Sequence, residues 1–245
     1  MNLYRTALPN AQIVVADLPG TRADRLVAEC PQIQFFPIDF LAGSAVLPLV
    51  DDLAAGGQLS DLIVLHGGLG DEAWEMARST TALSAEEVIT LNLTSVILLA
   101  STLLDRGVLQ GTLDAYATAT FTSSLNRRGG FKAEAYSAAK AGLIGAVAEL
   151  ASSAGPTNRV RVNAVEPGTV IDTWPEKHRQ HAETLGSSAP LGRYARAIDV
   201  ARAFFTATEL MCATTGAVFP VDCGQHLMRI TPRSVRHLTK LMEAT

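Results

Sequence analysis

Glycine is missing from the beginning of this sequence. The first glycine is Gly20, and none of the 245 residues belongs to a G-x-G-x-x-G run. Such a run lets the backbone approach a dinucleotide diphosphate at the N-terminus of a helix, where free N–H groups hold the anion. The sequence therefore lacks the residues that usually build this kind of phosphate-binding turn.

Cysteine and charge are sparse as well. Cys30, Cys212 and Cys223 lie far apart without C-x-x-C spacing, which is typical of reduced cysteines rather than of a metal or redox site. A net charge of −4 gives no broad basic surface, so we expect binding to neither nucleic acid nor anionic membranes. No apolar stretch approaches about 18 residues and no basic region precedes one, which favours a cytoplasmic protein that does not span a membrane.

Hydrophobic residues are plentiful, at 48% of the chain, which is enough to bury a full core in a single domain over residues 1–245. Short apolar runs alternate with longer segments of helical spacing, which predicts an α/β fold with a parallel sheet. The predicted strands are Ile13–Ala16, Ile33–Ile38, Leu62–Leu65, Ala115–Phe121, Val160–Val165 and Ala217–Val221. The predicted helices are Ala85–Asp105, Ala133–Ser153, Ala197–Met211 and a basic amphipathic tail over Arg229–Thr245.

The chemistry of the sequence centres on Tyr136 and Lys140. Residues four apart on a helix share a face, so the phenol and the ammonium project together. A lysine cation near a phenol favours the phenolate and lowers the phenol pKa from about 10, which makes the tyrosine an acid/base near neutrality. Ser123 lies thirteen residues before Tyr136 at the end of a predicted strand, and its hydroxyl could hold a substrate carbonyl or carbinol oxygen beside the phenol.

Further motifs accompany this pair in a fixed order. They are Asn92-Leu-Thr94 in a helix, Asn163-Ala-Val-Glu-Pro-Gly168 at a strand end and Thr215-Gly-Ala-Val-Phe-Pro-Val-Asp222. Together they resemble the short-chain dehydrogenase/reductase family, from about residue 11 to residue 228. The resemblance implies a Rossmann-like doubly wound parallel sheet of strand order 3-2-1-4-5-6-7, a nicotinamide cofactor and hydride transfer at a C–OH carbon. The implied tetrad is Asn92, Ser123, Tyr136 and Lys140.

The tetrad residues have structural readings as well. The family role of Lys140 includes holding the nicotinamide ribose, and that of Asn92 includes anchoring a water. Asn92 also bridges strands through a kinked helix in active relatives, and the structural alternative for Ser123 and Ser124 is a cap on the strand-to-helix connection. The chain can therefore have kept the geometry of the family tetrad either as a working catalytic site or as a site that no longer turns over substrate.

The resemblance also implies a set of cofactor-binding positions. They are Asp17, Asp39, His66, Gly67, Lys140, Pro167 and Gly168. Asp17 ends the second strand of the family fold. Its carboxylate would hydrogen-bond the adenosine ribose and disfavour a 2′-phosphate, so the expected preference is for NAD. Asp39 matches the family carboxylate near the adenine ring. Leu65-His-Gly-Gly68 stands where the family has Asn-Asn-Ala-Gly, and we interpret His66 as filling the pocket rather than acting as a base.

The N-terminus departs most from the family pattern. Residues 1–10 have the pattern of the tail of the first helix, so the sheet is expected to be degenerate, without its first strand and glycine turn. Removing that strand leaves a gap of about 9.6 Å between its neighbours, since strands lie about 4.8 Å apart. Either these neighbours pair directly, or Leu3–Leu8 folds back as an antiparallel strand, or the natural protein has residues upstream.

Three other features carry weaker signals. His178-x-x-His181 has the spacing of two metal ligands but no third ligand, so no metal site is predicted. Arg127-Arg128 is expected to be a solvated basic turn, with an anionic substrate or a partner carboxylate as the alternative ligand. Cys223 stands at a family glycine position and is expected to alter packing rather than chemistry.

Two functions follow from these observations. In the first, the chain is a non-catalytic subunit that binds no cofactor and supports an active paralogous subunit, which carries NAD, in a hetero-oligomeric alcohol dehydrogenase. It is then similar to the inactive partner subunits of two-subunit short-chain dehydrogenases that oxidise 3-hydroxyacyl-CoA esters in anaerobic aromatic degradation. In the second, it is an active NAD-dependent alcohol dehydrogenase or ketoreductase whose N-terminus is truncated, with NAD bound here.

The predicted partner surface favours the first function. Family members assemble through two long helices, here Ala85–Asp105 and Ala133–Ser153, and Ala141–Val147 offers small and apolar residues for close helix packing. This interface half is intact while the cofactor half is damaged. We therefore expect a heterotetramer, which a charge at Ala139 or Gly142 should split.

Overall fold

Strands and helices alternate along the part of the chain that the computed structural model describes, which is residues 10–30, 33–68, 83–129, 133–173, 183, 186–187 and 189–228. The strands are β1 (Val14–Asp17), β2 (Gln34–Pro37), β3 (Asp61–Val64), β4 (Ala117–Thr122), β5 (Val160–Pro167) and β6 (Val218–Val221). The α-helices are α2 (Thr21–Glu29), α3 (Val46–Ala55), α5 (Ala85–Ile89), α6 (Ser95–Asp105), α7 (Glu134–Asn158) and α9 (Ala197–Phe205). The main shorter turns are η2 (Thr90–Thr94), η3 (Leu125–Arg128), η5 (Thr206–Leu210) and η6 (Gln225–Leu227).

Every strand pair is parallel, which confirms the predicted α/β fold with parallel strands. β3, β4, β5 and β6 form one sheet in that order, and β1 and β2 form a second sheet of two strands. β5 is buried at all eight of its positions, as expected for a central strand with helices on both faces. All six strands lie within two residues of the predicted bounds.

Among the described strands, the sheet is interrupted between β1 and β3. These two strands share no ladder with each other and belong to separate sheets. Of the three alternatives for the missing strand, direct pairing of its two neighbours is therefore excluded, while Leu3–Leu8 lies outside the described residues. Helix α3 packs on α6 instead, and buried residues of both halves, such as Phe40, Val50 and Leu103, belong to one hydrophobic core. In the described part of the chain, side-chain packing thus joins the two halves.

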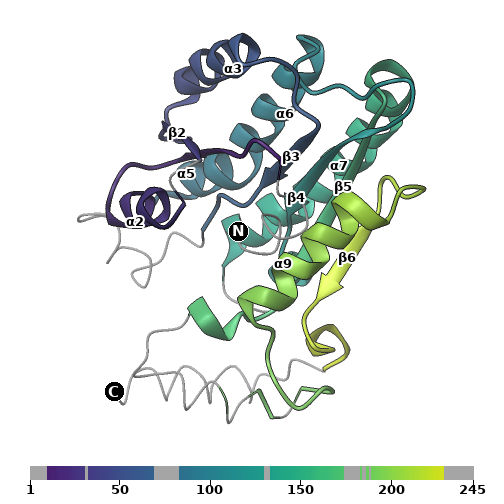
Figure 1. The fold of residues 1–245 in the computed structure, drawn as a ribbon. Coiled ribbons are helices and arrows are strands. Elements are labelled where there is room, and N and C mark those ends of the chain that lie inside the picture. The colour runs from purple at the N-terminus through teal and green to yellow at the C-terminus, as the bar shows by residue number, and fades with distance from the viewer. Residues whose placement is uncertain are drawn as a thin grey trace.

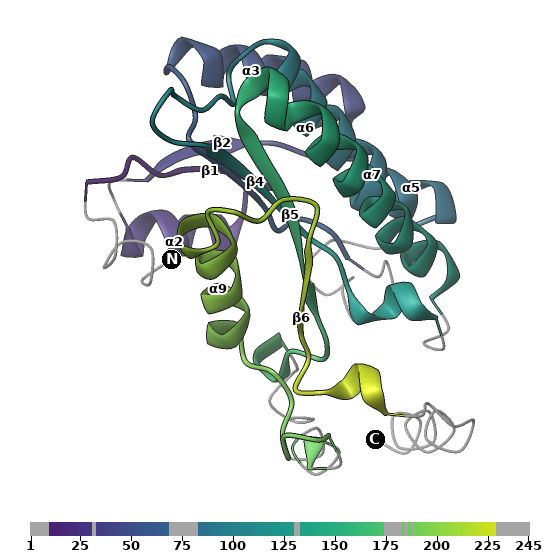
Figure 2. The same ribbon diagram turned by 90° about the vertical axis from the view of Figure 1, so that its right-hand side faces the viewer.

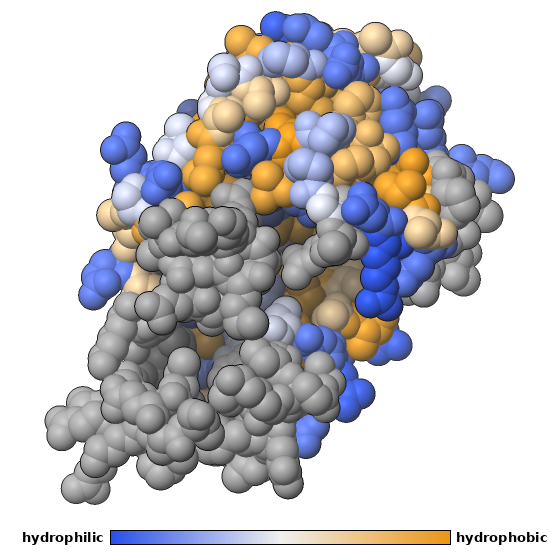
Figure 3. Space-filling view, turned by 90° about the vertical axis from the view of Figure 1, so that its left-hand side faces the viewer, coloured by the Kyte–Doolittle hydropathy of each residue, from blue (hydrophilic) through white to orange (hydrophobic). Residues whose placement is uncertain are grey.

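The helices cover both faces of the strands. Helices α3, α5, α6 and α7 lie side by side on one face, and α9 lies on the other, with α2 next to β1 and β2 (Figures 1 and 2). Viewed from the side on which α2 and β2 lie, apolar side chains reach the surface over the upper part of the molecule (Figure 3). This arrangement places the carboxyl ends of all six strands along one edge.

The predicted helix Ala85–Asp105 exists as α5, η2 and α6 in succession. Ser84 begins it with a capping box, since its side chain accepts from the Glu87 N–H while the Glu87 carboxylate accepts from the Ser84 N–H. The five residues of η2 form a π-helical turn, a feature that often marks a functional site.

The expectation that no apolar stretch approaches about 18 residues needs correction, because the helix Ala85–Asp105 has 21 residues and is long and apolar enough to cross a membrane. Its inner residues, including Val96 and Leu103, lie in the core, and a buried core helix has the same composition.

A buried arginine fixes α9 and η5 against the sheet. Arg161 of β5 donates to the carbonyl oxygens of Ala207, Thr208, Met211 and Thr214 at distances of 2.5 to 3.2 Å. Carbonyl groups at a helix C-terminus carry partial negative charge, so they compensate the buried guanidinium.

Several sequence expectations lie outside the described residues. They concern the helix tail over residues 1–9, the strand Leu3–Leu8, most of the irregular stretch after residue 173, His178, His181 and the tail from Arg229.

Candidate active site

The predicted site residues lie along the carboxyl edge of the strands. Ligands of open α/β sheets bind in the crevice outside this edge, at the point where the strand order reverses. Asp17 ends β1, Asp39 follows β2, His66 follows β3, Ser123 follows β4 and Pro167 ends β5. The predicted positions therefore lie at the carboxyl ends of strands from both sheets.

Lys140 is buried in α7, with 2% of its surface exposed. Its Nζ donates to the Thr122 carbonyl oxygen at 2.9 Å and lies 5.6 Å from the centre of the Tyr136 ring. Burial disfavours the ammonium and lowers the pKa of Lys140 to about 8. The phenol and the ammonium are thus neighbours, as their spacing predicted, with the lysine anchored to the strand end.

The phenol does not behave as the sequence predicted. Burial raises the pKa of Tyr136 above its ordinary value, and a hydrogen bond with Ser124 opposes that shift. Ser123, the serine chosen by spacing, is 1% exposed and donates its hydroxyl to the Lys140 carbonyl oxygen at 3.3 Å. Ser124 is the serine that contacts the phenol, and it also caps η3 by accepting from the Asn126 N–H.

Asn92 holds the turn after β3 against the central helix. Its side-chain amide donates to the carbonyl oxygens of Gly68 and Val88, each at 2.8 Å, and its oxygen accepts from the Gly68 N–H at 3.1 Å. Gly67 has a φ of 140°, and a Cβ there would overlap the Asn92 side chain. Asn92 therefore has the bridging role within the π-helical turn, and only glycine fits the neighbouring position.

His66 and Phe40 stack across the interrupted region. Their ring centroids are 4.0 Å apart with an interplanar angle of 6°, and His66 Nε2 lies 3.0 Å from the Ser95 hydroxyl. Burial, with a smaller contribution from the Lys140 charge, lowers the pKa of His66 to about 4. The imidazole is therefore neutral at pH 7, which agrees with the interpretation of His66 as a packing residue.

The two aspartates of the predicted cofactor site lie at the ends of β1 and β2. Both are exposed, and each accepts a local backbone hydrogen bond, Asp17 from the Leu18 N–H at 2.8 Å and Asp39 from the Leu41 N–H at 3.0 Å. They belong to the two-stranded half of the molecule.

Pro167 and Gly168 pack against the segment that follows β6. A Cβ on Gly168 would overlap Gln225 and Asp222, and the Gln225 side chain accepts from the Thr169 N–H at 2.7 Å. Asp222 in turn accepts from the His226 ring and from two backbone N–H groups. This end of the sheet is closely packed.

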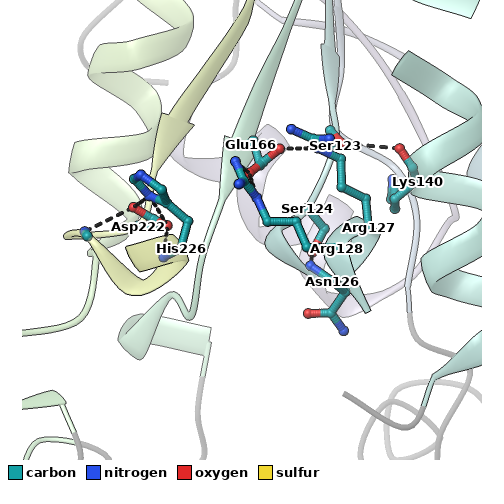
Figure 4. Close-up of polar contacts among 10 residues, drawn as sticks. Ser123, Ser124, Asn126, Arg127, Arg128, Lys140, Glu166, Asp222 and His226 are labelled. Atoms are coloured by element: carbon teal, nitrogen blue, oxygen red, sulfur yellow. Dashed lines mark hydrogen bonds and ion pairs between the residues drawn. The ribbon is translucent and has the colours of Figure 1, made fainter. Parts of the chain in front are cut away.

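Arg127 and Arg128 form an ion-paired cluster that the sequence analysis did not predict. Both guanidinium groups bind the carboxylate of Glu166, whose side chain is fully buried at the end of β5 (Figure 4). The expectation of a solvated basic turn is therefore wrong. Glu166 stands within the predicted strand motif Asn163–Gly168, but its position gave no signal that it faces η3.

Residues 5–226 match the protein family described as Enoyl-(Acyl carrier protein) reductase. The chain belongs to the short-chain dehydrogenase/reductase family. It is 30% identical over 198 residues to the 3-oxoacyl-[acyl-carrier-protein] reductase FabG of Chlamydia trachomatis, and this alignment covers 79% of this chain and 76% of that protein. It is 24% identical over 224 residues to the short-chain type dehydrogenase/reductase y4mP of Sinorhizobium fredii, covering 87% and 86% of the two chains.

Solved structures of the same family share the fold. A short-chain dehydrogenase/reductase from Burkholderia thailandensis superposes with a TM-score of 0.73 at 27% identity, covering 97% of this chain and 91% of that one. The 3-hydroxyacyl-CoA dehydrogenase type-2 of Mycobacterium avium gives a TM-score of 0.74 at 21% identity, covering 94% and 91%, which shows the fold alone. The predicted Rossmann-like fold is confirmed.

Proposed function

We propose that this short-chain dehydrogenase/reductase is a non-catalytic subunit of a hetero-oligomeric NAD-dependent alcohol dehydrogenase in the cytoplasm, paired with an active paralogous subunit. The observation that carries the proposal is the stack of Phe40 on His66. The two rings follow β2 and β3, beside the sheet interruption and at the edge where a dinucleotide binds in such folds. A cofactor adenosine entering from that edge would meet a packed, largely desolvated ring pair.

The residues present do not fit the diphosphate of NAD. Its usual ligands are backbone N–H groups of a glycine-rich turn before a helix, and the 245 residues contain no G-x-G-x-x-G. The Gly68 N–H after β3 is used by Asn92. Asp17 retains a carboxylate for a ribose, but one ribose contact is a small part of the binding energy. We therefore assign no hydride transfer to this chain.

The outer helices supply the surface for a partner. Ala141, Gly145 and Ala148 are exposed and lie on one face of α7, at i, i+4 and i+7. Ile89 and Leu98, on the adjoining α5 and α6, are exposed apolar side chains. Small residues let two helices approach closely, and we propose that this face joins the paralogous subunit within a heterotetramer.

One observation favours a second function, that of an active NAD-dependent dehydrogenase or ketoreductase. Tyr136 retains both a lysine neighbour and a serine hydrogen bond, which are the parts of an acid/base site. In that case Tyr136 would take the proton from a carbinol oxygen or give one to a carbonyl oxygen, and Ser124 would hold that oxygen. Residues upstream of Met1 would have to supply the diphosphate site.

The substitution Tyr136→Phe in the purified assembly distinguishes the two functions. For a non-catalytic subunit, turnover should change by less than about twofold, since no proton passes through this phenol. The matched control is the tyrosine-to-phenylalanine change in the partner subunit, which should abolish turnover. A loss of about 100-fold or more from the change in this chain would overturn the proposal in favour of the active enzyme.

A further inference from the structure

The cluster of Arg127, Arg128 and Glu166 carries a net positive charge in a partly buried position. Arg127 Nε binds one oxygen of Glu166, and Arg128 binds the other through Nε and Nη2 at 3.0 and 2.9 Å. Two guanidinium groups against one carboxylate leave an excess of one positive charge. Asp222, the other acid labelled in Figure 4, is paired with His226 after the neighbouring strand.

The two arginines differ in exposure. The Glu166 side chain is 0% exposed, that of Arg127 is 25% exposed and that of Arg128 is 41% exposed. Each guanidinium has five N–H donors in a fixed fork, and Glu166 occupies one donor of Arg127 and two of Arg128. Within the described residues, donors on both forks therefore remain for a ligand, held in place by an anchor that is itself shielded from water.

The cluster also lies close to the phenol. Ser124, which contacts Tyr136, is the cap of the same η3 turn that carries Arg127 and Arg128. A 3₁₀ turn rises about 2 Å per residue, so the backbone of Arg128 lies roughly 8 Å along the turn from Ser124. A ligand of a few carbon atoms can span that length.

We propose that Arg127 and Arg128 form a binding site for the carboxylate or phosphate group of a small molecule, oriented by the buried Glu166. Planar guanidinium forks match both oxyanions through paired hydrogen bonds. The inference goes beyond the proposed function and is independent of it, because such a ligand binds whether or not the chain transfers hydride. A single arginine would neutralise Glu166, and the second, half-exposed one supplies the charge for the ligand.

Titration calorimetry of the full chain with malonate and with inorganic phosphate, at ionic strength held constant with sodium chloride, tests the site. We expect saturable millimolar binding of at least one probe. Arg128→Met should weaken it about tenfold or more, whereas Glu166→Gln, which raises the local charge, should strengthen it about threefold. The control is Arg106→Met, which removes an arginine that is 40% exposed and likewise paired with one carboxylate, that of Asp51.

The two probes separate the two sources of oxyanion, since malonate mimics a carboxylic acid and phosphate mimics a phosphate monoester. Binding of neither probe would overturn the proposal, as would equal losses in Arg128→Met and Arg106→Met. If Glu166→Gln does not fold by circular dichroism, the comparison of Arg128→Met with Arg106→Met decides alone. Because no nicotinamide is used, failure of this test leaves the proposed subunit role unaffected.

Discussion

At the scale of single residues, the two adjacent serines after β4 show what spacing can predict and what it cannot. The thirteen-residue spacing selected Ser123, but that hydroxyl is buried against the Lys140 carbonyl oxygen while Ser124 contacts the phenol. Successive residues of an extended segment point to opposite sides. Spacing could place the pair at the site, but the choice between them depends on the backbone path into η3.

Replacing Ser124 by alanine should raise the pKa of Tyr136 further, because its hydrogen bond is the interaction that lowers it. Ser123→Ala, the matched control, should leave the phenol unchanged, since Ser123 bonds to the backbone of Lys140. An ultraviolet titration of tyrosine ionisation, with Tyr136→Phe to identify the signal, measures both. A larger shift in Ser123→Ala than in Ser124→Ala would show that the assignment is reversed.

His66 should make the fold sensitive to acid. Its pKa is about 4 in the folded chain and about 6.5 when unfolded, so between these values the unfolded state binds more protons. The free energy of unfolding should then fall as the pH drops from 6.5 to 4, by about 3 kcal/mol at most from this residue.

The variant His66→Phe keeps an aromatic ring on Phe40 and removes the titration. Urea unfolding at several pH values should show a smaller acid loss in this variant than in the natural chain, with little difference above pH 7. Parallel pH profiles in the two proteins would mean that the imidazole is solvated rather than packed.

At the scale of elements, the strands were predictable because each is a short apolar run bounded by polar or turn residues. The long helix Ala85–Asp105 was predictable from its periodicity, but its π-helical turn at Thr90–Thr94 was not, since that depends on Asn92 bonding the turn after β3. The partners of Arg161 and Glu166, both buried on β5, were equally hidden. Each is satisfied by groups from distant elements, which a single sequence does not bring together.

The element-scale expectation about α7 needs one revision. Ala139 is 1% exposed within its own chain, and a Cβ at Gly142 would lie 3.1 Å from Leu93, so a charge at either position would disturb the fold itself. Gly145 is the better site, because a Cβ there meets no atom within 4 Å in the described chain.

Gly145→Glu should therefore split the assembly without unfolding the subunit. Replacing a helix-interior glycine stabilises the isolated helix by up to about 1 kcal/mol, while a charge in an apolar helix contact disfavours association. Sedimentation velocity should show smaller species, and circular dichroism an intact fold. Ser152→Glu, exposed on the same helix, is the control. If Gly145→Glu leaves the assembly at the size of the natural one, α7 is not the partner surface.

At the scale of the whole molecule, the described strands β1 and β3 belong to two separate sheets. The sequence predicted a degenerate sheet and left three ways of closing it open, of which the described strands exclude direct pairing. The two halves are joined by the packing of α3 on α6 and by one shared core. Neither contact requires β1 and β3 to approach to hydrogen-bonding distance. Periodicity predicts elements, whereas how two half-sheets accommodate a gap depends on side-chain volumes across the whole core.

The most direct test of the central claim is calorimetric titration of the purified full chain, without any partner, with NAD and with NADH. The chain lacks a diphosphate turn and has Phe40 and His66 stacked at the crevice, so we predict no saturable binding up to millimolar cofactor. The assembly with the active paralogue should instead bind one cofactor per partner subunit. A stoichiometric complex of the isolated chain with a micromolar dissociation constant would contradict the account.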